Sequence, residues 1–167
     1  MKVTQGLIIS ISSLWLLFGI DAIAQQAPPF ALVNSSGSMV YKKELKGNLV
    51  ISFFASYCQP CKKELPALVD VVERYEKEKN ISLVLITADI NDQSGEALDK
   101  ARKFLKDIGI EREFLLDIYH TAISKYSPKK IVPATFLVNR QGYFIFREIG
   151  ARDDTVSRLE KYIQSLK

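Results

Sequence analysis

The two cysteines of this chain lie three positions apart, and their surroundings constrain the fold more than any other feature of the sequence. They occur in FFASYCQPCKKELPAL, residues 53–68, as Cys58 and Cys61. Before them, residues 48–54 form a continuous apolar and β-branched run, which is typical of a strand buried on both faces. After them, apolar residues recur at helical spacing over residues 59–79. The sequence therefore predicts a buried strand that leads directly into a helix, with the pair at the junction.

The rest of the chain alternates between strand-like and helix-like segments. Residues 81–89 predict a second buried strand after the helix at 59–79. A later hairpin turns at Gly142, and the chain closes with an amphipathic helix. This order predicts an α/β fold: a central mixed sheet flanked by helices on both faces, with an N-terminal strand pair and an inserted helical segment. The other predicted elements are a strand pair at 30–45, a helix at 94–109, a short strand at 113–117, a short helix at 119–126, the hairpin at 131–150 and the last helix at 153–167.

Residues 1–24 have the three parts of a secretory signal peptide. Lys2 precedes an apolar stretch at residues 7–20, and small residues lead to a cleavage point predicted after Ala24. An uncleaved membrane anchor is the alternative interpretation. However, Asp21 ends the apolar stretch before it reaches the ~18 residues that an anchor needs. Either way, the domain is predicted to lie outside the cytoplasm.

Composition and charge indicate one ordinary globular domain. The 167 residues are 47% hydrophobic and 25% charged. We expect residues 25–29 to form a linker and residues 30–167 to form the domain. The net charge of +4 is mild, and the short lysine clusters lack the interleaved aromatic residues of a base-stacking surface. A nucleic-acid partner is therefore not expected.

The position of the cysteine pair favours reactivity over structural stabilisation. A disulfide between Cys58 and Cys61 closes a very short loop, so it constrains the unfolded chain little. At a helix N-terminus, unpaired N–H groups and the helix dipole favour a thiolate at Cys58, which makes it a nucleophile. Cys61, one turn later, is placed to resolve a mixed disulfide, and Pro60 suits the first helical turn. Two such thiolates could also bind copper(I) or supply half of a zinc site.

Two motifs resemble those of a known family. The pattern aromatic-Cys-x-Pro-Cys-Lys/Arg-x-Glu-x-Pro is matched from Tyr57 to Pro66, and Pro-x-Thr-Phe-Leu is matched from Pro133 to Leu137. With the inserted segment at 94–109 between them, the chain resembles the TlpA/ResA-like extracytoplasmic thiol–disulfide oxidoreductases, which have a thioredoxin-like fold. The likeness covers roughly residues 28–166. It departs at Tyr57, where the family most often has tryptophan, and this bears on partner contacts and redox potential.

The resemblance implies a role for each matched residue. Cys58 would be the exposed nucleophile and Cys61 the resolving thiol, joined in a redox disulfide. Pro133 would be a cis-proline that faces the pair and seats the partner's backbone. Glu64 would be a partly buried acid that raises thiol pKa or relays a proton, whereas the residues alone favour a solvated helix charge beside two lysines. Contacts with the partner protein would come from Tyr57, Gln59, Pro60 and Val132.

Two alternatives would use different chemistry. One alternative is a copper-binding metallochaperone or metal-site assembly factor on this fold. Resemblance to such proteins would imply a CxxxC pair and a distant histidine as the metal ligands. Here the spacing is two, and His120 is the only histidine of the sequence. The site of a peroxiredoxin-like peroxidase resembles the motif Pro-x-x-x-Thr-x-x-Cys. This chain has Ile51 where that motif has proline and Ala55 where it has threonine. We retain the copper protein as the alternative.

The resemblance thus implies an enzyme, a thiol–disulfide oxidoreductase that reduces disulfides of exported proteins. We expect no cofactor and no metal, and a monomer in the periplasm or at the extracytoplasmic face of the inner membrane. Apocytochrome c, with its CxxCH haem site, is the leading substrate class, and a membrane thiol-reductant donor protein would recharge the enzyme. The proline and the lack of histidine between the cysteines resemble reducing members of the family.

Overall fold

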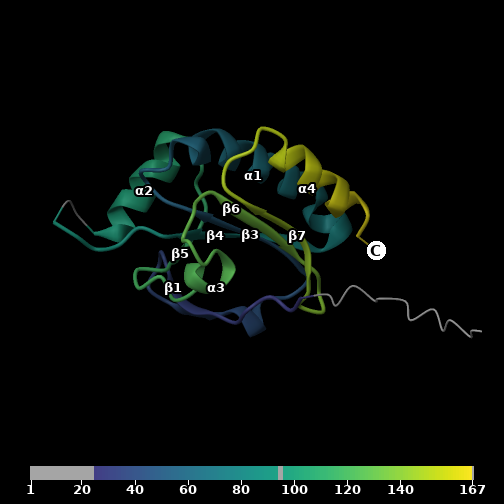
Figure 1. Cartoon of the computed structure of the whole chain (residues 1–167), viewed down its shortest axis with the longest axis horizontal. Helices are drawn as coiled ribbons and strands as arrows, with labels where there is room; N and C mark the ends of the chain where they lie inside the picture. Colours follow the sequence, from purple (N-terminus) through teal and green to yellow (C-terminus); the bar gives the residue numbers. More distant parts are fainter. Residues whose placement is uncertain (1–24, 94–95, 167) are drawn as a thin grey trace, which may run out of the picture.

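A mixed sheet of seven strands lies at the centre of the computed structural model, which describes residues 25–93 and 96–166. The strands are β1 (Ala31–Asn34), β2 (Met39–Tyr41), β3 (Asn48–Phe54), β4 (Ile81–Thr87), β5 (Leu115–Leu116), β6 (Ala134–Val138) and β7 (Phe144–Ile149). The helices are η1 (Lys42–Glu44), α1 (Gln59–Lys79), α2 (Ala97–Asp107), α3 (Ile123–Tyr126) and α4 (Thr155–Gln164). The strand order is β2-β1-β5-β4-β3-β6-β7. Helices α1, α2 and α4 cover one face and α3 covers the other (Figure 1). The predicted α/β architecture is therefore confirmed.

The central strands are the most apolar ones, as their sequences indicate. Every residue of β3 is buried, and β3 pairs in parallel with β4 and antiparallel with β6. Because side chains alternate along a strand, Val50 and Phe54 pack under α1 and α2, while Ile51 and Phe53 pack in the core on the α3 side. Ser52 is thus a polar residue on the face that α1 covers.

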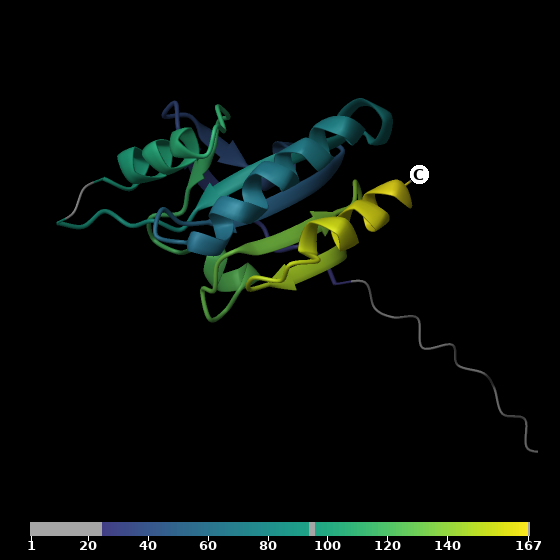
Figure 2. The same cartoon turned by 90° about the horizontal axis from the view of Figure 1, so that it is seen from above.

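Helix α1 follows β3 through a short loop and lies beside α4 on the sheet (Figure 2). Its predicted bounds are confirmed, and Cys61, Leu65 and Leu68 are fully buried. The Tyr75 hydroxyl donates a hydrogen bond to Glu160 of α4 at 3.1 Å. The dithiol segment therefore begins a helix that is anchored both to the sheet and to a second helix.

Several segments are shorter than predicted: β4 ends at Thr87 rather than at residue 89, β5 covers only two residues of the predicted 113–117, and α3 begins at Ile123 rather than at residue 119. Helix α2 begins at Ala97, later than the predicted start at residue 94, which lies outside the described residues. The Asn91 side-chain oxygen accepts a hydrogen bond from the Ala97 N–H at 2.8 Å. Asn91, in the preceding loop, therefore caps the N-terminus of α2 in place of a residue next to the helix. The last helix begins at Thr155, two residues later than predicted.

The N-terminal end of the described chain contacts the β6–β7 hairpin. Within residues 25–29, predicted as a linker, the Ala27 N–H donates to the Gly142 carbonyl at 2.8 Å, and the Phe144 N–H donates to the Gln25 carbonyl at 2.9 Å. The predicted signal peptide, residues 1–24, lies outside the described residues. Among the helices of the described part, none has the length and hydrophobicity needed to cross a membrane.

Candidate active site

Cys58 and Cys61 lie where β3 gives way to α1. Cys58 is the N-cap residue of the helix with an extended backbone, and Pro60 lies in the first turn, where its missing N–H costs no helical bond. The Cys58 sulfur accepts a hydrogen bond from the Cys61 N–H at 3.2 Å. The two sulfurs are bonded to each other, so the structure represents the oxidised form.

The accessibility of the pair is lower than expected for Cys58. As whole residues, Cys58 is 5% exposed and Cys61 is 0% exposed, so the residual exposure of the pair belongs to Cys58, in the predicted order. Burial follows from packing, because both cysteines belong to the apolar core between the sheet and the helices. Tyr57, in contrast, is 68% exposed, and Gln59 and Pro60 are also exposed. The segment around the pair therefore offers contacts to a partner, while the two cysteines themselves are mostly covered by packing.

Asp89 holds the loop before Cys58, a role that the sequence did not indicate. Its carboxylate is 3% exposed and accepts hydrogen bonds from the Ser56 N–H at 2.9 Å and the Ser56 hydroxyl at 2.6 Å. A third bond comes from the Thr87 hydroxyl at 2.6 Å. Because a buried carboxylate is costly without partners, this set of bonds locks the loop to the end of β4. The only sequence signal was an aspartate at the end of a predicted strand.

The second motif begins at Pro133, which precedes β6. The Val132–Pro133 peptide bond is cis, as the resemblance implied. Pro133 is buried, its carbonyl accepts the Gly150 N–H at 2.8 Å, and Val132 packs against the core that contains both cysteines. The role of Pro133 and Val132 toward a partner stays a prediction.

Glu64 is buried under α1, so its interpretation as a solvated helix charge is wrong. It is 9% exposed, and the Thr135 hydroxyl donates to its Oε1 at 2.7 Å. The hydroxyl oxygen of Ser52 lies 3.3 Å from the hydroxyl oxygen of Thr135. Burial raises the pKa of the Glu64 carboxyl above its ordinary value, the bond from Thr135 lowers it in part, and the negative charge of Glu148 raises it. The carboxyl thus lies three residues after Cys61 in a site that favours its protonated form.

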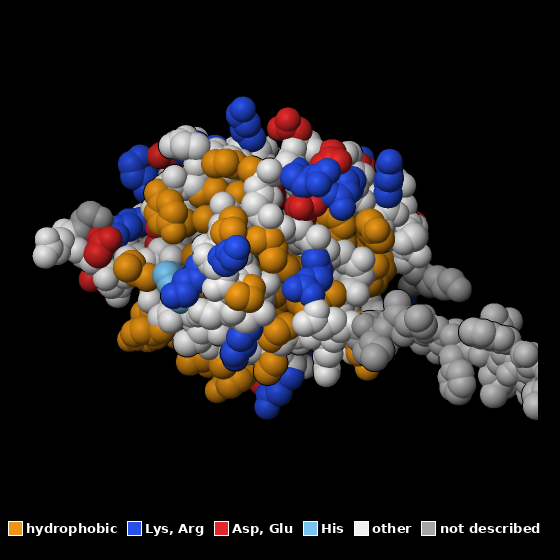
Figure 3. Space-filling view, viewed as in Figure 1, with side chains coloured by type: hydrophobic (Ala, Val, Ile, Leu, Met, Phe, Trp, Pro, Cys, Tyr) orange, Lys and Arg blue, Asp and Glu red, His pale blue; other side chains and the backbone are white. Residues whose placement is uncertain are grey.

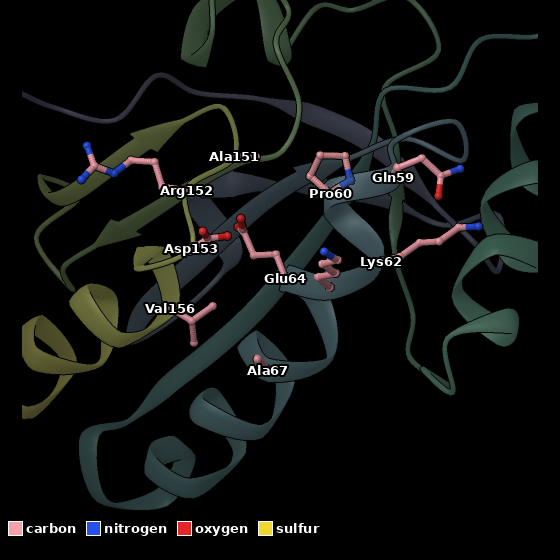
Figure 4. A pocket seen from close by; sticks show the side chains of 10 residues that line it. Gln59, Pro60, Lys62, Glu64, Ala67, Ala151, Arg152, Asp153 and Val156 are labelled. Atoms are coloured by element: carbon pink, nitrogen blue, oxygen red, sulfur yellow. The ribbon is translucent and has the colours of Figure 1, made fainter.

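A surface groove of about 610 Å³ opens beside this acid. Figure 4 shows its two walls: Lys62, Glu64 and Ala67 extend from α1, and Arg152 and Val156 come from the opposite side. Gln59, Pro60, Lys63, Ala151 and Asp153 complete the lining. Since Gln59 and Pro60 separate the two cysteines, the groove begins at the dithiol segment and can receive a chain that approaches it.

Other chemistries find less support in the site. Ile51 and Ala55, at the positions where a peroxidase would need proline and threonine, are both fully buried apolar residues. In residues 25–93 and 96–166, no three or more His, Cys, Asp or Glu side chains are grouped to hold a metal ion. The His120 ring forms a hydrogen bond with the Ala88 carbonyl at 2.8 Å, and its backbone is left-handed, ahead of α3.

Comparisons with known proteins agree with this geometry. The model of the AhpC/TSA family matches residues 23–145. A thiol-disulfide oxidoreductase ResA of Bacillus cereus is 28% identical over 145 residues, which cover 86% of this chain and 78% of that protein. The thioredoxin-like protein YneN of Bacillus subtilis is 29% identical over 139 residues, or 82% of this chain and 76% of YneN.

Solved structures show the same fold. A putative thiol:disulfide interchange protein DsbE from Chlorobium tepidum superposes with a TM-score of 0.73 at 24% identity, over 86% of this chain and 96% of that one. A putative protein disulfide isomerase from Bacteroides thetaiotaomicron gives a TM-score of 0.75 at 23% identity, over 86% and 89%. The fold is therefore thioredoxin-like, as predicted.

Proposed function

The chain belongs to the AhpC/TSA family, and on this premise we propose that it reduces disulfide bonds of other proteins outside the cytoplasm. It is a thiol–disulfide oxidoreductase with a thioredoxin-like fold. The observation that carries the proposal is the Cys58–Cys61 disulfide at the N-terminus of α1, next to an open groove. Its relatives, which are named thiol-disulfide oxidoreductase ResA, support thiol–disulfide exchange as the chemistry.

The reaction consumes one dithiol and one disulfide. In the reduced enzyme, the Cys58 thiolate attacks a sulfur of the partner's disulfide; that S–S bond breaks, and the partner's other sulfur leaves as a thiolate and takes up a proton. Cys61 then loses its proton and attacks the Cys58 sulfur. The mixed disulfide breaks, the second partner sulfur leaves, and the Cys58–Cys61 bond forms. Two electrons pass to the partner, which is released as a dithiol.

The helix end supports the first step. The Cys58 sulfur lies at the N-cap of α1, where it accepts the Cys61 N–H at 3.2 Å. Unpaired N–H groups and the positive end of the helix dipole stabilise negative charge on this sulfur. Cys58 is therefore both the better nucleophile and the better leaving group of the two.

Glu64 supports the second step. It lies one helical turn after Cys61, is buried and is held by the Thr135 hydroxyl. We propose that its ionised form receives the proton that Cys61 must lose and passes it to solvent through the groove that Glu64 lines. In this scheme Pro133 seats the backbone of the partner beside the dithiol.

The partner is proposed to be an exported protein with a disulfide in an accessible segment. Tyr57, Gln59, Pro60 and Val132 would contact it, and the exposed Ile131 lies beside Val132. The face of the molecule in Figure 3 carries lysine and arginine side chains among exposed hydrophobic ones. Apocytochrome c with its CxxCH segment is the proposed substrate class, and a membrane thiol-reductant donor would regenerate the enzyme.

Defined substrates and cysteine variants test this function. The reduced protein is mixed with an oxidised CxxCH peptide, and released thiols are followed over time. We expect Cys58→Ser to abolish reduction and Cys61→Ser to accumulate a mixed disulfide, visible by mass spectrometry without reductant. The double variant serves as the control for non-covalent association.

The redox potential of the Cys58–Cys61 couple, measured against glutathione, distinguishes a reductant from an oxidant. A Cys61→Ser protein that forms no mixed disulfide with any disulfide peptide would contradict the mechanism. Reduction of a generic disulfide peptide without any preference for CxxCH would retain the oxidoreductase and remove apocytochrome c as the substrate class.

A further inference from the structure

A row of polar side chains crosses three strands beneath α1. Ser52 of β3 is paired with Thr135 of β6, and Thr135 is paired with Glu148 of β7. Residues paired directly across antiparallel strands point to the same face, so the three side chains lie in line. Thr135 donates to Glu64 at 2.7 Å and lies 3.3 Å from Ser52. Glu148 is therefore the third member of this row, on the strand next to the one that carries Thr135.

Glu148 is itself paired with positive charge. Its side chain is 14% exposed and forms an ion pair and hydrogen bond with the Arg158 guanidinium of α4. Arg152, which is 56% exposed, lies 3.8 Å from the same carboxylate. Because the surroundings of Glu148 are partly desolvated, its charge acts on Glu64 with less screening than a surface charge would. This negative charge raises the pKa of Glu64, in addition to the larger effect of burial.

We propose that Glu148 and Arg158 are a positioning pair that sets how readily Glu64 takes up and releases the proton of Cys61. Glu148 disfavours a second negative charge on Glu64, and Arg158 limits this effect by neutralising Glu148. The inference rests on the function proposed above and extends its site beyond the two sequence motifs. Neither residue contacts the sulfurs, so both act only through Glu64.

The remaining charged groups around Glu64 are more exposed. Arg152 and Asp153 of the β7–α4 loop line the same groove, as do Lys62 and Lys63 on α1 itself. Thr135 is the neutral partner on β6. Solvent screens the exposed groups, so their influence falls with salt, whereas that of the Glu148–Arg158 pair persists.

Opposite shifts in a pH profile test the proposal. A mixed disulfide is formed between Cys58 and a small thiol in the full chain, and its resolution by Cys61 is measured by stopped flow from acid to alkaline pH. On the acid side of the profile, the rate should rise with pH as Glu64 ionises. Glu148→Gln should move this acid limb to lower pH, because Glu64 then ionises more easily. Arg158→Met should move it to higher pH, because Glu148 then keeps only the more exposed Arg152 as a positive neighbour. At the wild-type midpoint half of Glu64 is ionised, so the rate should rise by less than about twofold in Glu148→Gln. It should fall by about twofold to fivefold in Arg158→Met, since a shift of one pKa unit changes the ratio of ionised to protonated Glu64 about tenfold.

Opposite signs separate this role from a structural one, because both variants break the same ion pair. The matched control is Arg74→Met, which breaks a different ion pair of α4, the one from Arg74 of α1 to Glu160 at 2.8 Å, and should leave the profile unchanged. In a Glu64→Gln background, Glu148→Gln should have no further effect on the acid limb.

Three outcomes would overturn the proposal: shifts of the same sign, no shift in either variant, or a shift that persists without Glu64. If the wild-type protein does not resolve the mixed disulfide at all, the proposed oxidoreductase mechanism itself fails. The two failures are therefore distinguishable.

Discussion

Replacing Asp89 with alanine should destabilise the oxidised protein by about 3–5 kcal/mol. The carboxylate accepts three hydrogen bonds, two from Ser56 and one from Thr87, and it is 3% exposed. A hydrogen bond to a charged group contributes about 1.5–3 kcal/mol, and removal of the acceptor leaves buried donors unpaired. The estimate lies below the simple sum because the two hydroxyl groups can reorient toward other acceptors. The free energy of unfolding is measured by urea denaturation, followed by circular dichroism.

Two other variants make this experiment specific. Asp89→Asn keeps one oxygen for the Ser56 N–H and can donate its amide hydrogens to the Ser56 hydroxyl, so we expect a loss of only about 1 kcal/mol. Asp70→Ala on the exposed side of α1 is the control and should stay within about 0.5 kcal/mol of wild type. Disulfide reduction should slow in Asp89→Ala, since Ser56 lies two residues before Cys58. An Asp89→Ala protein within about 1 kcal/mol of wild type would refute the view that this carboxylate holds the loop.

Two further predictions concern the backbone and the buried acid. Gly47→Ala should cost about 3 kcal/mol or more in the free energy of unfolding, because Gly47 has φ +78° and a Cβ there would overlap the Asn80 carbonyl oxygen. Gly37→Ala, with φ +91° but nothing within 4 Å, should cost only about 1–2 kcal/mol; equal losses would argue against the overlap. Because burial raises the pKa of Glu64 in the folded state, the stability of the oxidised wild type relative to Glu64→Gln should be highest at acid pH. It should fall as pH rises from the ordinary glutamate pKa through the raised one, and a relative gain over that window would contradict the burial argument.

Local patterns in the sequence were sufficient for most of the architecture. The apolar run at 48–54 and the helical periodicity at 59–79 predicted β3 and α1 with their observed bounds. This works because side-chain periodicity reports directly which face of an element is buried. The same pattern located Cys58 at the helix start. The cis bond before Pro133 came only from the family resemblance, because a proline in a sequence does not reveal its isomer.

The electrostatic environment of the site was decided by tertiary structure. Glu64 looks solvated beside its neighbouring lysines, and its burial depends on Thr135, 71 positions away, brought beneath α1 by the pairing of β6 with β3. Asp89 likewise meets Ser56 across 33 positions. A sequence determines which residues a local element presents, and that much was readable here. The proton affinity of a carboxyl depends on desolvation and on charges brought close by distant segments, so only the folded chain determines it.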